Sequence, residues 1–423
     1  MAAPTKRYSF WWENSPPDFA FQPQLNTSAD IVIIGAGFAG ISTAYWLLRL
    51  TKASKKRIRI LVLDKAPYAA FKASGRMNGS VYLGSNKTPK AVVNKVGKTN
   101  AQALYHYSAA NNTLLREVLV DRGLDCGAEF NGGLRMASTA KDVVELDASE
   151  EILGDWGFVP VRFDRDQTQH IMIAPKIQGA LYIPEEGMFD PFSYCNKLTQ
   201  LMRKASIQTV YNANVTRVES FSDRAPIVHL ENGHTITAGS IIHATSETVE
   251  SDAIQDSIVR RREHVIRTEP LSEELDSDLP LPVMPIEFSK GLDSVRLHRR
   301  SVMMTGGKAG LRKDPELGVT NDNGYNRKLL DHLDDTMATQ LPVTNHLAIE
   351  YAWTYIETST EDELPLMGAV PGLANQFVNI AHGRNKFGLA MLGSKNVAES
   401  VLRLKVHDEE FEIFDPARLT KGE

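Results

Sequence analysis

Cysteine is scarce in this chain, with only Cys126 and Cys195 among 423 residues. Two cysteines are too few for the disulfide framework of a small secreted domain or for a zinc–thiolate cluster. We therefore predict a reducing compartment and no metal site. The first 28 residues also lack the apolar run of a signal peptide, because Arg7, Glu13 and Asp18 interrupt them. The sequence therefore favours a cytoplasmic protein.

The chain also lacks a strong excess of either charge. The net charge is −5, from 47 basic and 52 acidic side chains. This balance gives no reason to expect nucleic acid or an anionic membrane surface as a partner. One stretch at 31–48 is uncharged and just long enough to cross a membrane. Its glycines, and the polar segment and strand pattern that follow, argue against a membrane span.

A length of 423 residues exceeds the usual size of one core, so two intertwined domains are expected. Residues 1–28 form an irregular arm that carries Tyr8, Phe10, Trp11 and Trp12. Aromatic rings bury much apolar area when they dock, so we expect the arm to pack on the main body. A contact with a substrate channel or a partner protein is the alternative.

The most informative stretch lies at 29–64. It contains, in order, a strand pattern at 30–34, glycines at 35, 37 and 40 (G-x-G-x-x-G), a helix pattern at 38–50, a strand pattern at 58–63, and Asp64. In such a turn Gly35 allows the tight bend, Gly37 lets the backbone approach a pyrophosphate, and Gly40 lets helix and strand pack closely. The helix N-terminus attracts phosphate, and Asp64 can bind a ribose. This order of elements predicts a dinucleotide site.

The rest of the chain divides into recognisable segments. Small residues at 73–80 (ASGRMNGS) predict a loop that approaches a ligand closely. We predict short strands at 133–136 and 170–174, a helix that Asp190-Pro191 begins, and a hairpin closed by Asn232-Gly233. Strand-like pieces in 250–346 predict an antiparallel sheet in a second domain. A final helix is predicted at about 387–405, with Gly388 at its start.

Together these motifs resemble the FAD-dependent D-amino-acid oxidase superfamily, especially its glycine/sarcosine oxidase and γ-glutamylputrescine oxidoreductase branch. The resemblance rests on the fingerprint with Asp64, the 73–80 loop, 187–191 (GMFDP), Ala244-Thr245, 268–271 (TEPL), 350–368 with Trp353, Thr360, Asp362, Pro365 and Gly368, and 381–388 with His382. Two departures affect the expected pocket. Met77 is an insertion in the first loop, and Tyr355 replaces the usual glycine after the tryptophan.

The resemblance implies an α/β fold in which a Rossmann-like FAD-binding domain carries an inserted antiparallel-sheet substrate domain, as in D-amino-acid oxidase and glutathione reductase. We assign 1–28 to the N-terminal arm, 29–95, 186–250 and 347–423 to the FAD-binding domain, and 96–185 and 251–346 to the substrate domain. The FAD is expected to be non-covalent, because neither cysteine lies near the closing motifs where sarcosine-oxidase relatives attach it.

The resemblance also implies which residues contact FAD. They are Gly35, Ala36, Gly37, Phe38, Ala39, Gly40, Asp64, Lys65, Ser74, Gly75, Arg76, Met77, Asn78, Gly79, Val215, Ala244, Thr245, Gly383, Arg384, Asn385, Lys386, Phe387 and Gly388. The isoalloxazine is expected between the Ser74–Gly79 and Gly383–Gly388 loops. Arg384 or Lys386 could place a positive charge near the reduced flavin.

The expected reaction is oxidation of the C–N bond of a primary or secondary amine, an amino acid or a polyamine derivative, to an imine. Hydride passes to flavin N5, and O2 or another acceptor reoxidises the flavin. Tyr351 and Trp353 alternate along one strand and are candidates for the substrate side, together with His382 and Lys308. Arg296, Arg299 and Arg300 are candidates for holding a substrate carboxylate.

Several questions stay open at this level. Sarcosine oxidases carry a lysine where Met304 is expected here, which leaves oxidase and dehydrogenase as alternatives. An NAD(P)-dependent dehydrogenase would explain 29–64 but not the closing motifs. A non-catalytic flavin-binding subunit of a larger complex would explain the altered 73–80 loop.

Overall fold

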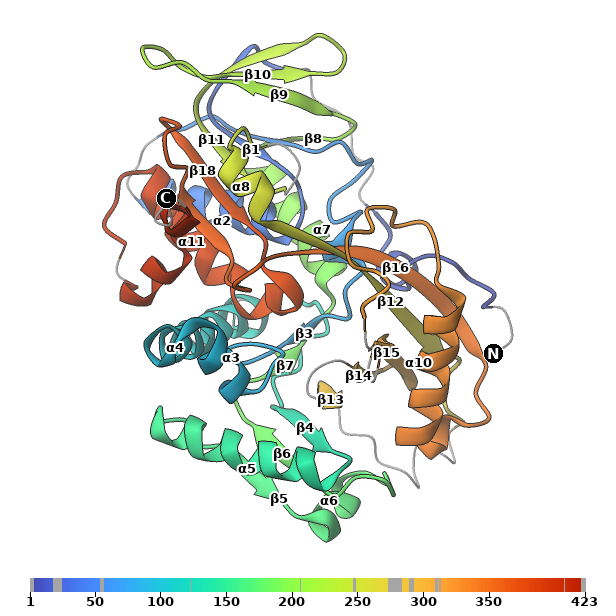
Figure 1. Cartoon of the computed structure of the whole chain (residues 1–423). Helices are drawn as coiled ribbons and strands as arrows, with labels where there is room; N and C mark the ends of the chain where they lie inside the picture. The colour runs from blue at the N-terminus through green and yellow to red at the C-terminus, as the bar shows by residue number, and fades with distance from the viewer. Residues whose placement is uncertain are drawn as a thin grey trace.

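In the computed structural model the described residues are 4–419, apart from gaps at 18–24, 54–56, 122, 206, 246–248, 273–283, 289–292, 309–310, 312 and 407. Part of the expected arm, 18–24, therefore lies outside the described residues. Two eight-stranded sheets organise the chain, one in the upper and one in the lower part of Figure 1. No helix within the described ranges has the length and apolar character needed to cross a membrane.

The first sheet has a parallel core. Its order is β17–β18–β11–β1–β2–β8, with β10 and β9 added beside β11. The strands are β1 (Ser28–Ile34), β2 (Ile60–Leu63), β8 (Gln208–Val210), β9 (Val215–Glu219), β10 (Ile227–Leu230), β11 (Thr235–His243), β17 (Leu366–Ala369) and β18 (Gln376–Ile380). β1 pairs in parallel with β2 and β11. The predicted hairpin is confirmed, because β10 and β11 are antiparallel and Gly233 between them has a φ of 82°.

Alternate residues of β1 face different layers. Ile31 and Ile33 join the core formed with the helices, whereas Val32 and Ile34 pack on the other face with residues of β9 and β10. The helices on the first face are α2 (Phe38–Ala53), α4 (Lys98–Arg116), α7 (Pro191–Lys204) and α11 (Ala390–Val401). This layering of helices, parallel sheet and antiparallel strands is typical of a dinucleotide-binding domain.

The second sheet runs in the order β16–β12–β15–β14–β13–β4–β6–β5. Its strands are β4 (Gly133–Ala137), β5 (Val161–Phe163), β6 (Gly179–Ile183), β12 (Ile258–Thr268), β13 (Ile286–Phe288), β14 (Asp293–His298), β15 (Ser301–Gly306) and β16 (Ile349–Thr360). All neighbours are antiparallel except β13 and β4. β16 belongs to this sheet, although it lies within the 347–423 segment assigned above to the FAD-binding domain.

The two faces of the second sheet have different neighbours. Ile266, Met304 and Ala352 pack with Leu330 and Leu333 of α10 (Arg327–Gln340). The opposite face carries Val265, Met303, Tyr351, Trp353 and Tyr355, which belong to the same core as the helices of the first domain. The second sheet therefore presents one face toward the expected cofactor domain.

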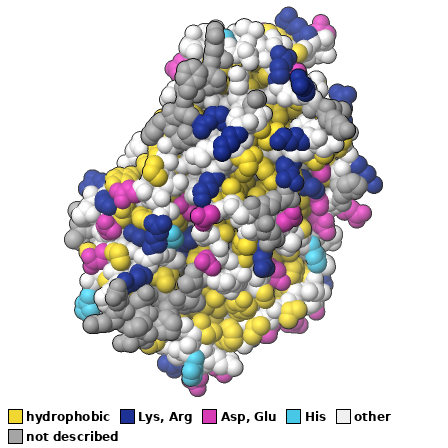
Figure 2. All heavy atoms as spheres, turned by 180° about the vertical axis from the view of Figure 1, so that it is seen from behind, with side chains coloured by type: hydrophobic (Ala, Val, Ile, Leu, Met, Phe, Trp, Pro, Cys, Tyr) yellow, Lys and Arg dark blue, Asp and Glu magenta, His cyan; other side chains and the backbone are white. Residues whose placement is uncertain are grey.

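The remaining elements connect or cover the sheets. They are α1 (Trp11–Asn14), η1 (Ala73–Gly75), β3 (Ser80–Val81), α3 (Pro89–Val96), the π-helix η2 (Glu117–Asp121), α5 (Ala140–Asp155), α6 (Arg165–Ile171), β7 (Gly187–Met188), α8 (Asp252–Ser257), η4 (Pro342–Thr344), η5 (Gly383–Gly388), η6 (Glu409–Phe414) and η7 (Pro416–Leu419). On the face turned away in Figure 1, Lys and Arg side chains gather over the upper half, and Asp and Glu lie mainly across the middle and lower half (Figure 2).

Two local predictions are wrong. Residues 170–174 do not form a strand, because α6 covers 165–171 and is held by a capping box between Asp164 and Gln167. The final helix begins at Ala390, and Gly388 instead ends the short 3-10 segment η5. The predicted start at Asp190 is confirmed, since its carboxylate accepts hydrogen bonds from the N–H groups of Phe192 and Ser193 at 3.0 and 2.9 Å.

Candidate functional site

The glycine turn after β1 has the close approaches that its sequence requires. A Cβ on Gly40 would lie 1.9 Å from the carbonyl oxygen of Gly35, so α2 and β1 touch backbone to backbone. Gly35 has a φ of 112°, and a Cβ there would lie 2.7 Å from Thr245. A Cβ on Gly37 would lie 2.9 Å from Ser74 Oγ. Backbone atoms therefore exclude a side chain at Gly35 and Gly40, whereas Gly37 is crowded only by the Ser74 side chain.

A cavity of about 380 Å³ opens beside this turn. Nine residues predicted to bind the cofactor line it: Gly35, Gly37, Asp64, Lys65, Ser74, Val215, Ala244, Thr245 and Lys386. The cavity lies where β1 and β2 end and α2 begins, which is the usual place for a ligand in an open parallel sheet. These nine residues come from six separated stretches of the chain, and the fold brings them to one cavity.

The polar groups of the cavity suit a dinucleotide. Asp64 is held in place because its Oδ2 accepts from Ala36 N at 2.6 Å and its Oδ1 from Ala66 N at 2.8 Å. Basic side chains of Lys65, Lys72 and Lys386 also line the cavity, together with Arg260. A pyrophosphate carries negative charge, so these cations and the N-terminus of α2 complement it. The residues present thus fit the expected FAD, whose ribose Asp64 would bind.

The Ser74–Gly79 loop is held through five consecutive carbonyl oxygens. These oxygens accept hydrogen bonds as follows: Gly75 O from Ser9 Oγ at 2.8 Å, Arg76 O from Trp353 Nε1 at 2.7 Å, Met77 O from Trp11 Nε1 at 2.8 Å, Asn78 O from Arg296 Nη1 at 2.6 Å, and Gly79 O from Phe189 N at 3.0 Å. The donors come from the arm, the second sheet and the segment before α7. Such a set of partners fixes the loop's shape in the absence of regular secondary structure.

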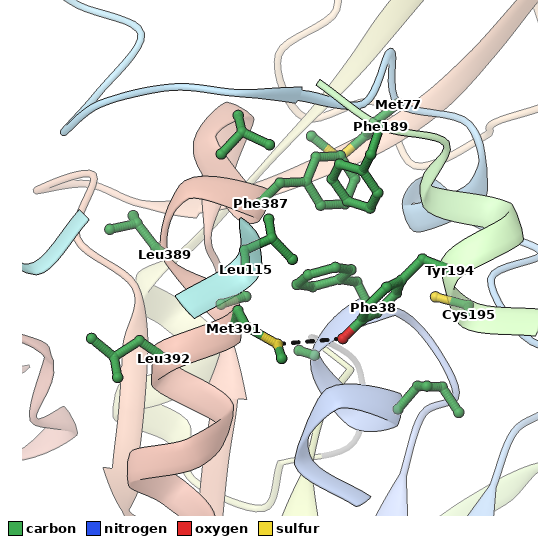
Figure 3. Close-up of a cluster of buried hydrophobic side chains, with 14 of the residues drawn as sticks. Phe38, Met77, Leu115, Phe189, Tyr194, Cys195, Phe387, Leu389, Met391 and Leu392 are labelled. Atoms are coloured by element: carbon green, nitrogen blue, oxygen red, sulfur yellow. Dashed lines mark hydrogen bonds between the residues drawn. The ribbon is translucent and has the colours of Figure 1, made fainter. Parts of the chain in front are cut away.

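The Gly383–Gly388 loop meets this region from the other end of the chain. Figure 3 shows Phe387 beside Phe189 and Met77, with Phe38 and Tyr194 below them. The ring centroid of Phe387 lies 5.0 Å from the ring centroid of Phe38 and 5.0 Å from that of Phe189. The structure therefore brings the N-terminal and C-terminal loops together around one aromatic core.

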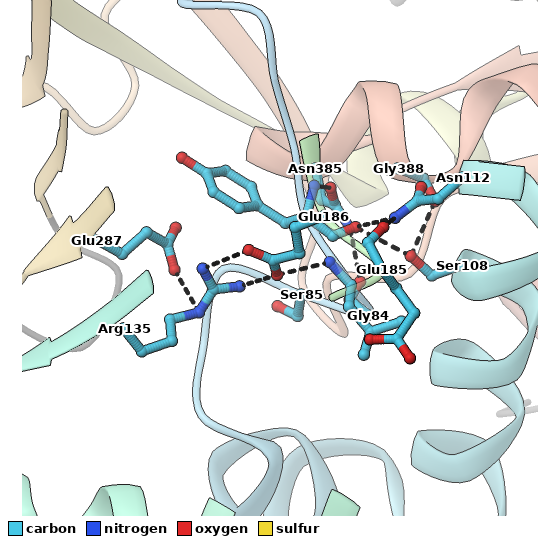
Figure 4. A network of polar contacts seen from close by, with 12 residues as sticks. Gly84, Ser85, Ser108, Asn112, Arg135, Glu185, Glu186, Glu287, Asn385 and Gly388 are labelled. Carbon is cyan, nitrogen blue, oxygen red and sulfur yellow. Dashed lines mark hydrogen bonds and ion pairs between the residues drawn. The ribbon is translucent and has the colours of Figure 1, made fainter. Parts of the chain in front are cut away.

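A buried ion network lies near Asn385 and Gly388 of the second loop (Figure 4). Arg135 Nη1 donates to Glu186 Oε2 at 3.0 Å, and its Nε lies 2.8 Å from Glu287 Oε2. Glu186 also accepts from Leu83 N at 2.9 Å. Glu287 is 2% exposed, and burial raises its pKa to about 7, with Glu186 adding to the rise and Arg135 opposing it. Two carboxylates sharing one guanidinium thus leave a proton-accepting group near neutral pH.

Two further buried carboxylates lie on the same face of the second sheet. Lys308 Nζ forms an ion pair of 2.6 Å with Glu263 Oε1. Burial raises the pKa of Glu357 to about 7, and the charge of Glu263 contributes to the rise. The charges of Glu263 and Glu357 in turn favour the positive form of Arg384. Lys308, predicted to be catalytic, is therefore already paired with a carboxylate.

The other residues predicted to be catalytic have distinct surroundings. Tyr351 is covered by the arm, because Lys6 Nζ donates to its hydroxyl at 2.6 Å. Trp353 is 2% exposed and holds the first loop. Burial, with the charge of Lys386, lowers the pKa of His382 to about 3, so its imidazole is neutral at pH 7. Its Nε2 lies 2.8 Å from Asn379 Oδ1, which fixes the proton on that nitrogen.

Some predicted cofactor contacts lie away from the cavity wall. Ala36, Phe38, Ala39, Gly40, Gly75, Arg76, Met77, Asn78, Gly79, Gly383, Arg384, Asn385, Phe387 and Gly388 do not line it. Ten of them belong to the Ser74–Gly79 and Gly383–Gly388 loops. The sequence did not single out Tyr82, Glu287 or Ser294, whose side chains meet where Tyr82 and Ser294 hydroxyls hydrogen-bond. No spacing signal joins these three residues, since they come from separate strands and a loop.

Arg296, a candidate for holding a substrate carboxylate, binds backbone oxygens instead. It is 1% exposed, and its Nη1 donates to the carbonyl oxygens of Asn78 and Phe189 at 2.6 and 2.8 Å. Its guanidinium also lies 5.1 Å from the centre of the Trp11 ring. Arg296 therefore serves the loop rather than an open pocket. Among the described residues, no group of three or more His, Cys, Asp or Glu side chains could hold a metal ion.

Comparison with known proteins agrees with this geometry. The chain is 22% identical to a probable oxidoreductase, OrdL, of Haemophilus influenzae over 96% of this chain and 90% of that protein. It is 21% identical to a D-amino acid dehydrogenase of Neisseria meningitidis over 88% and 95% of the two chains. Its fold matches a glycine oxidase from Geobacillus kaustophilus with a TM-score of 0.76 at 18% identity, covering 93% of this chain and 99% of the other.

The family comparison covers most of the molecule. Residues 30–400 match the sequence model of the FAD-dependent oxidoreductase family named DAO. This span contains the glycine turn, both loops and both sheets, so the predicted α/β fold with an added antiparallel domain is confirmed. FAD, rather than the NAD(P) considered as an alternative, is the cofactor of this family. The chain belongs to the DAO family of FAD-dependent oxidoreductases.

Proposed function

We propose that this protein oxidises the C–N bond of a primary or secondary amine, an amino acid or a polyamine derivative, to an imine that then hydrolyses. Bound FAD supplies the two-electron acceptor, and O2 or another acceptor reoxidises it. Two relatives named above, a D-amino acid dehydrogenase and a glycine oxidase, support this choice of substrate. The substrates in their names have a carbon that is bonded to nitrogen and also carries hydrogen.

The observation that carries the proposal is the place of Glu287, since its neighbour on β14, Ser294, accepts a hydrogen bond from Asn78 of the first loop at 2.8 Å. An amine must lose its ammonium proton before it can give up hydride, because the nitrogen lone pair drives the bond cleavage. A general base works best when its pKa lies near the working pH, and the pKa of Glu287 is about 7. Glu287 pairs directly with Ser294 across β13 and β14, and Ser294 contacts Tyr82 beside the first loop.

We assign the remaining roles from charge and contact. Glu287 takes the proton from the ammonium, while Tyr82 and Ser294 orient the amine. Arg384 is flanked electrostatically by Glu263, Glu357 and Tyr355, and its positive charge can offset negative charge on a reduced cofactor. Four residues are expected from the sequence to be catalytic. Of these, we propose that Trp353 and His382 lie beside the two loops. We propose that Tyr351 and Lys308 act by holding the arm and Glu263.

An anaerobic bleaching screen tests the proposal. The protein reconstituted with FAD is mixed without oxygen with single amino acids, N-methyl amino acids, and di- and polyamines. Loss of the oxidised flavin absorbance with at least one amine is expected, with a rate that rises through pH 7 as Glu287 ionises. Full absorbance with every amine would reject the proposal and favour a flavin-binding subunit without its own activity. Repeating the positive reaction in air, with peroxide measured, separates oxidase from dehydrogenase.

A further inference from the structure

The N-terminal arm at residues 4–15 is built into the second sheet. Lys6 N donates to Glu350 O, and Ala352 N donates to Lys6 O, both at 3.0 Å, so the arm adds a parallel bridge beside β16. The short helix α1 follows, and its Trp11 is fully buried. Phe10 lies under Arg267, whose guanidinium is 3.8 Å from the ring centre. The arm is therefore ordered by backbone pairing as well as by aromatic packing.

Two side chains of this arm donate to the Ser74–Gly79 loop. Ser9 Oγ donates to Gly75 O and Trp11 Nε1 donates to Met77 O, each at 2.8 Å. Met77 is the residue inserted relative to the motif that the loop resembles. The carbonyl oxygen of Met77 thus accepts a hydrogen bond from Trp11, a residue that lies before the glycine turn in the sequence.

The arm also reaches the partners of the neighbouring carbonyl. The Trp11 ring lies 5.1 Å from the guanidinium of Arg296, which donates to Asn78 O. Asn14 Nδ2 donates to Asp190 Oδ2 at 2.6 Å. Asp190 is the N-cap of α7 and follows Phe189 in the sequence. Three of the five donors to the loop's carbonyl oxygens therefore lie in the arm or touch it, namely Ser9, Trp11 and Arg296. The other two donors are Trp353 and the backbone N–H of Phe189, and the arm reaches only Asp190, the residue after Phe189.

We propose that residues 4–15 position the Ser74–Gly79 loop for the cofactor, and that Trp11 is the positioning residue at its centre. This inference rests on the FAD site of the proposed function, but not on the choice of amine. Without the Trp11 donor, the buried Met77 oxygen would turn toward another partner and the loop would occupy its binding shape for a smaller fraction of the time. The apparent affinity for a ligand falls in proportion to that fraction.

The test compares Trp11→Phe with Trp156→Phe. Phe keeps an aromatic ring against Arg296 but removes the N–H donor. Trp156 is also buried, at 4% exposed, and its Nε1 has no hydrogen-bond partner within the described part of the chain, so it reports the cost of the ring change alone. Ser9→Ala, which removes the donor to Gly75 O, is a second and milder variant. Thermal unfolding of the apoprotein, the FAD dissociation constant and the flavin midpoint potential are measured for each.

Trp11→Phe is expected to raise the FAD dissociation constant about fivefold, as the loss of one hydrogen bond to a buried acceptor implies, and to shift the midpoint potential. Trp156→Phe should change only the thermal unfolding. An unchanged dissociation constant and potential in both Trp11→Phe and Ser9→Ala would overturn the proposal, whatever happens to the thermal unfolding. Both quantities are measured without an amine, so they judge the arm even if the protein oxidises none of the amines tested.

Discussion

The indole nitrogen of Trp353 donates a hydrogen bond of 2.7 Å to the carbonyl oxygen of Arg76. This contact joins β16 of the second sheet to the loop that follows the dinucleotide fold. Arg76 in turn donates from Nη1 to Thr354 O at 3.2 Å, so the loop and the strand hold each other in both directions. The substrate-side sheet and the cofactor-side loop are therefore not independent parts, and a change in one is expected to reach the other.

Trp353→Phe tests this coupling. The ring remains, but the buried Arg76 oxygen loses its donor, which costs about 1–3 kcal/mol in the loop conformation that binds FAD. We expect weaker FAD binding together with slower amine-dependent flavin reduction. Trp46→Phe is the control, because Trp46 is 7% exposed and its Nε1 has no hydrogen-bond partner within the described residues. FAD titration and anaerobic stopped-flow absorbance measure the two effects; equal behaviour of the two variants would contradict the coupling.

The glycine turn allows a sharper separation of binding from folding. Gly37→Val places a side chain at the cavity wall, where the nearest atom to its Cβ is Ser74 Oγ at 2.9 Å. We expect at least about tenfold weaker FAD binding, since the backbone can no longer approach the pyrophosphate. Thermal unfolding of the apoprotein should change little by comparison.

Gly154→Ala is the matched control for this substitution. Gly154 lies in α5, and an added Cβ there would meet nothing within 4 Å. Alanine favours a helix interior over glycine by about 1 kcal/mol, so this variant should be as stable as the natural protein or more so. FAD binding by isothermal titration should be unchanged in Gly154→Ala, and tight binding by Gly37→Val would place the pyrophosphate elsewhere.

The parts of the fold that the sequence predicts well are those fixed by local backbone demands. The turn at Gly35, the helix start at Asp190 and the hairpin at Gly233 each need one residue type at one place, and that requirement is visible in the sequence. The strand predicted at 170–174 is wrong because a capping box between Asp164 and Gln167 starts a helix there. That signal is local too, and it outweighs the apolar residues at the end of α6.

The parts of the site that the sequence does not predict depend on strand register and on distant pairs. A shift of one residue turns a side chain to the other face of a sheet, and Met303, not Met304, faces the cofactor domain. The pairing of Arg135 with Glu186 and Glu287 joins three separate segments. The contact between Tyr351 and the arm likewise forms only when the arm packs on the second sheet. No periodicity in either segment predicts this contact.

Lys386 gives a pH dependence to cofactor binding. Burial lowers its pKa to about 8, while Glu357 opposes this shift. Lys386 lines the cofactor cavity, so a bound pyrophosphate should restore its charge and raise its pKa again. Binding then takes up a proton above pH 8, and FAD affinity should fall by up to about tenfold per pH unit from there toward pH 10.

Lys386→Met is expected to remove this dependence, because its side chain has a similar length and no charge. FAD titrations at several pH values between 7 and 10 measure it for both proteins. Weaker binding by the variant at pH 7 with a flat profile above pH 8 supports the assignment. A slope that survives in Lys386→Met would assign the proton to another group of the cavity.

Glu287 gives a pH dependence to stability rather than to cofactor binding. Burial raises its pKa from 4.5 to about 7, so between these two values the folded state keeps a proton that the unfolded state has lost. The contribution of Glu287 to stability therefore declines as pH rises through this window, by about 3 kcal/mol in all, because one pKa unit corresponds to about 1.4 kcal/mol. Glu287→Gln cannot ionise and should escape the decline. Thermal unfolding at pH 5, 6, 7 and 8 should show the variant gaining on the natural protein as pH rises. A constant difference would mean that Glu287 ionises normally, and it could then no longer serve as the base that accepts the amine's proton near pH 7.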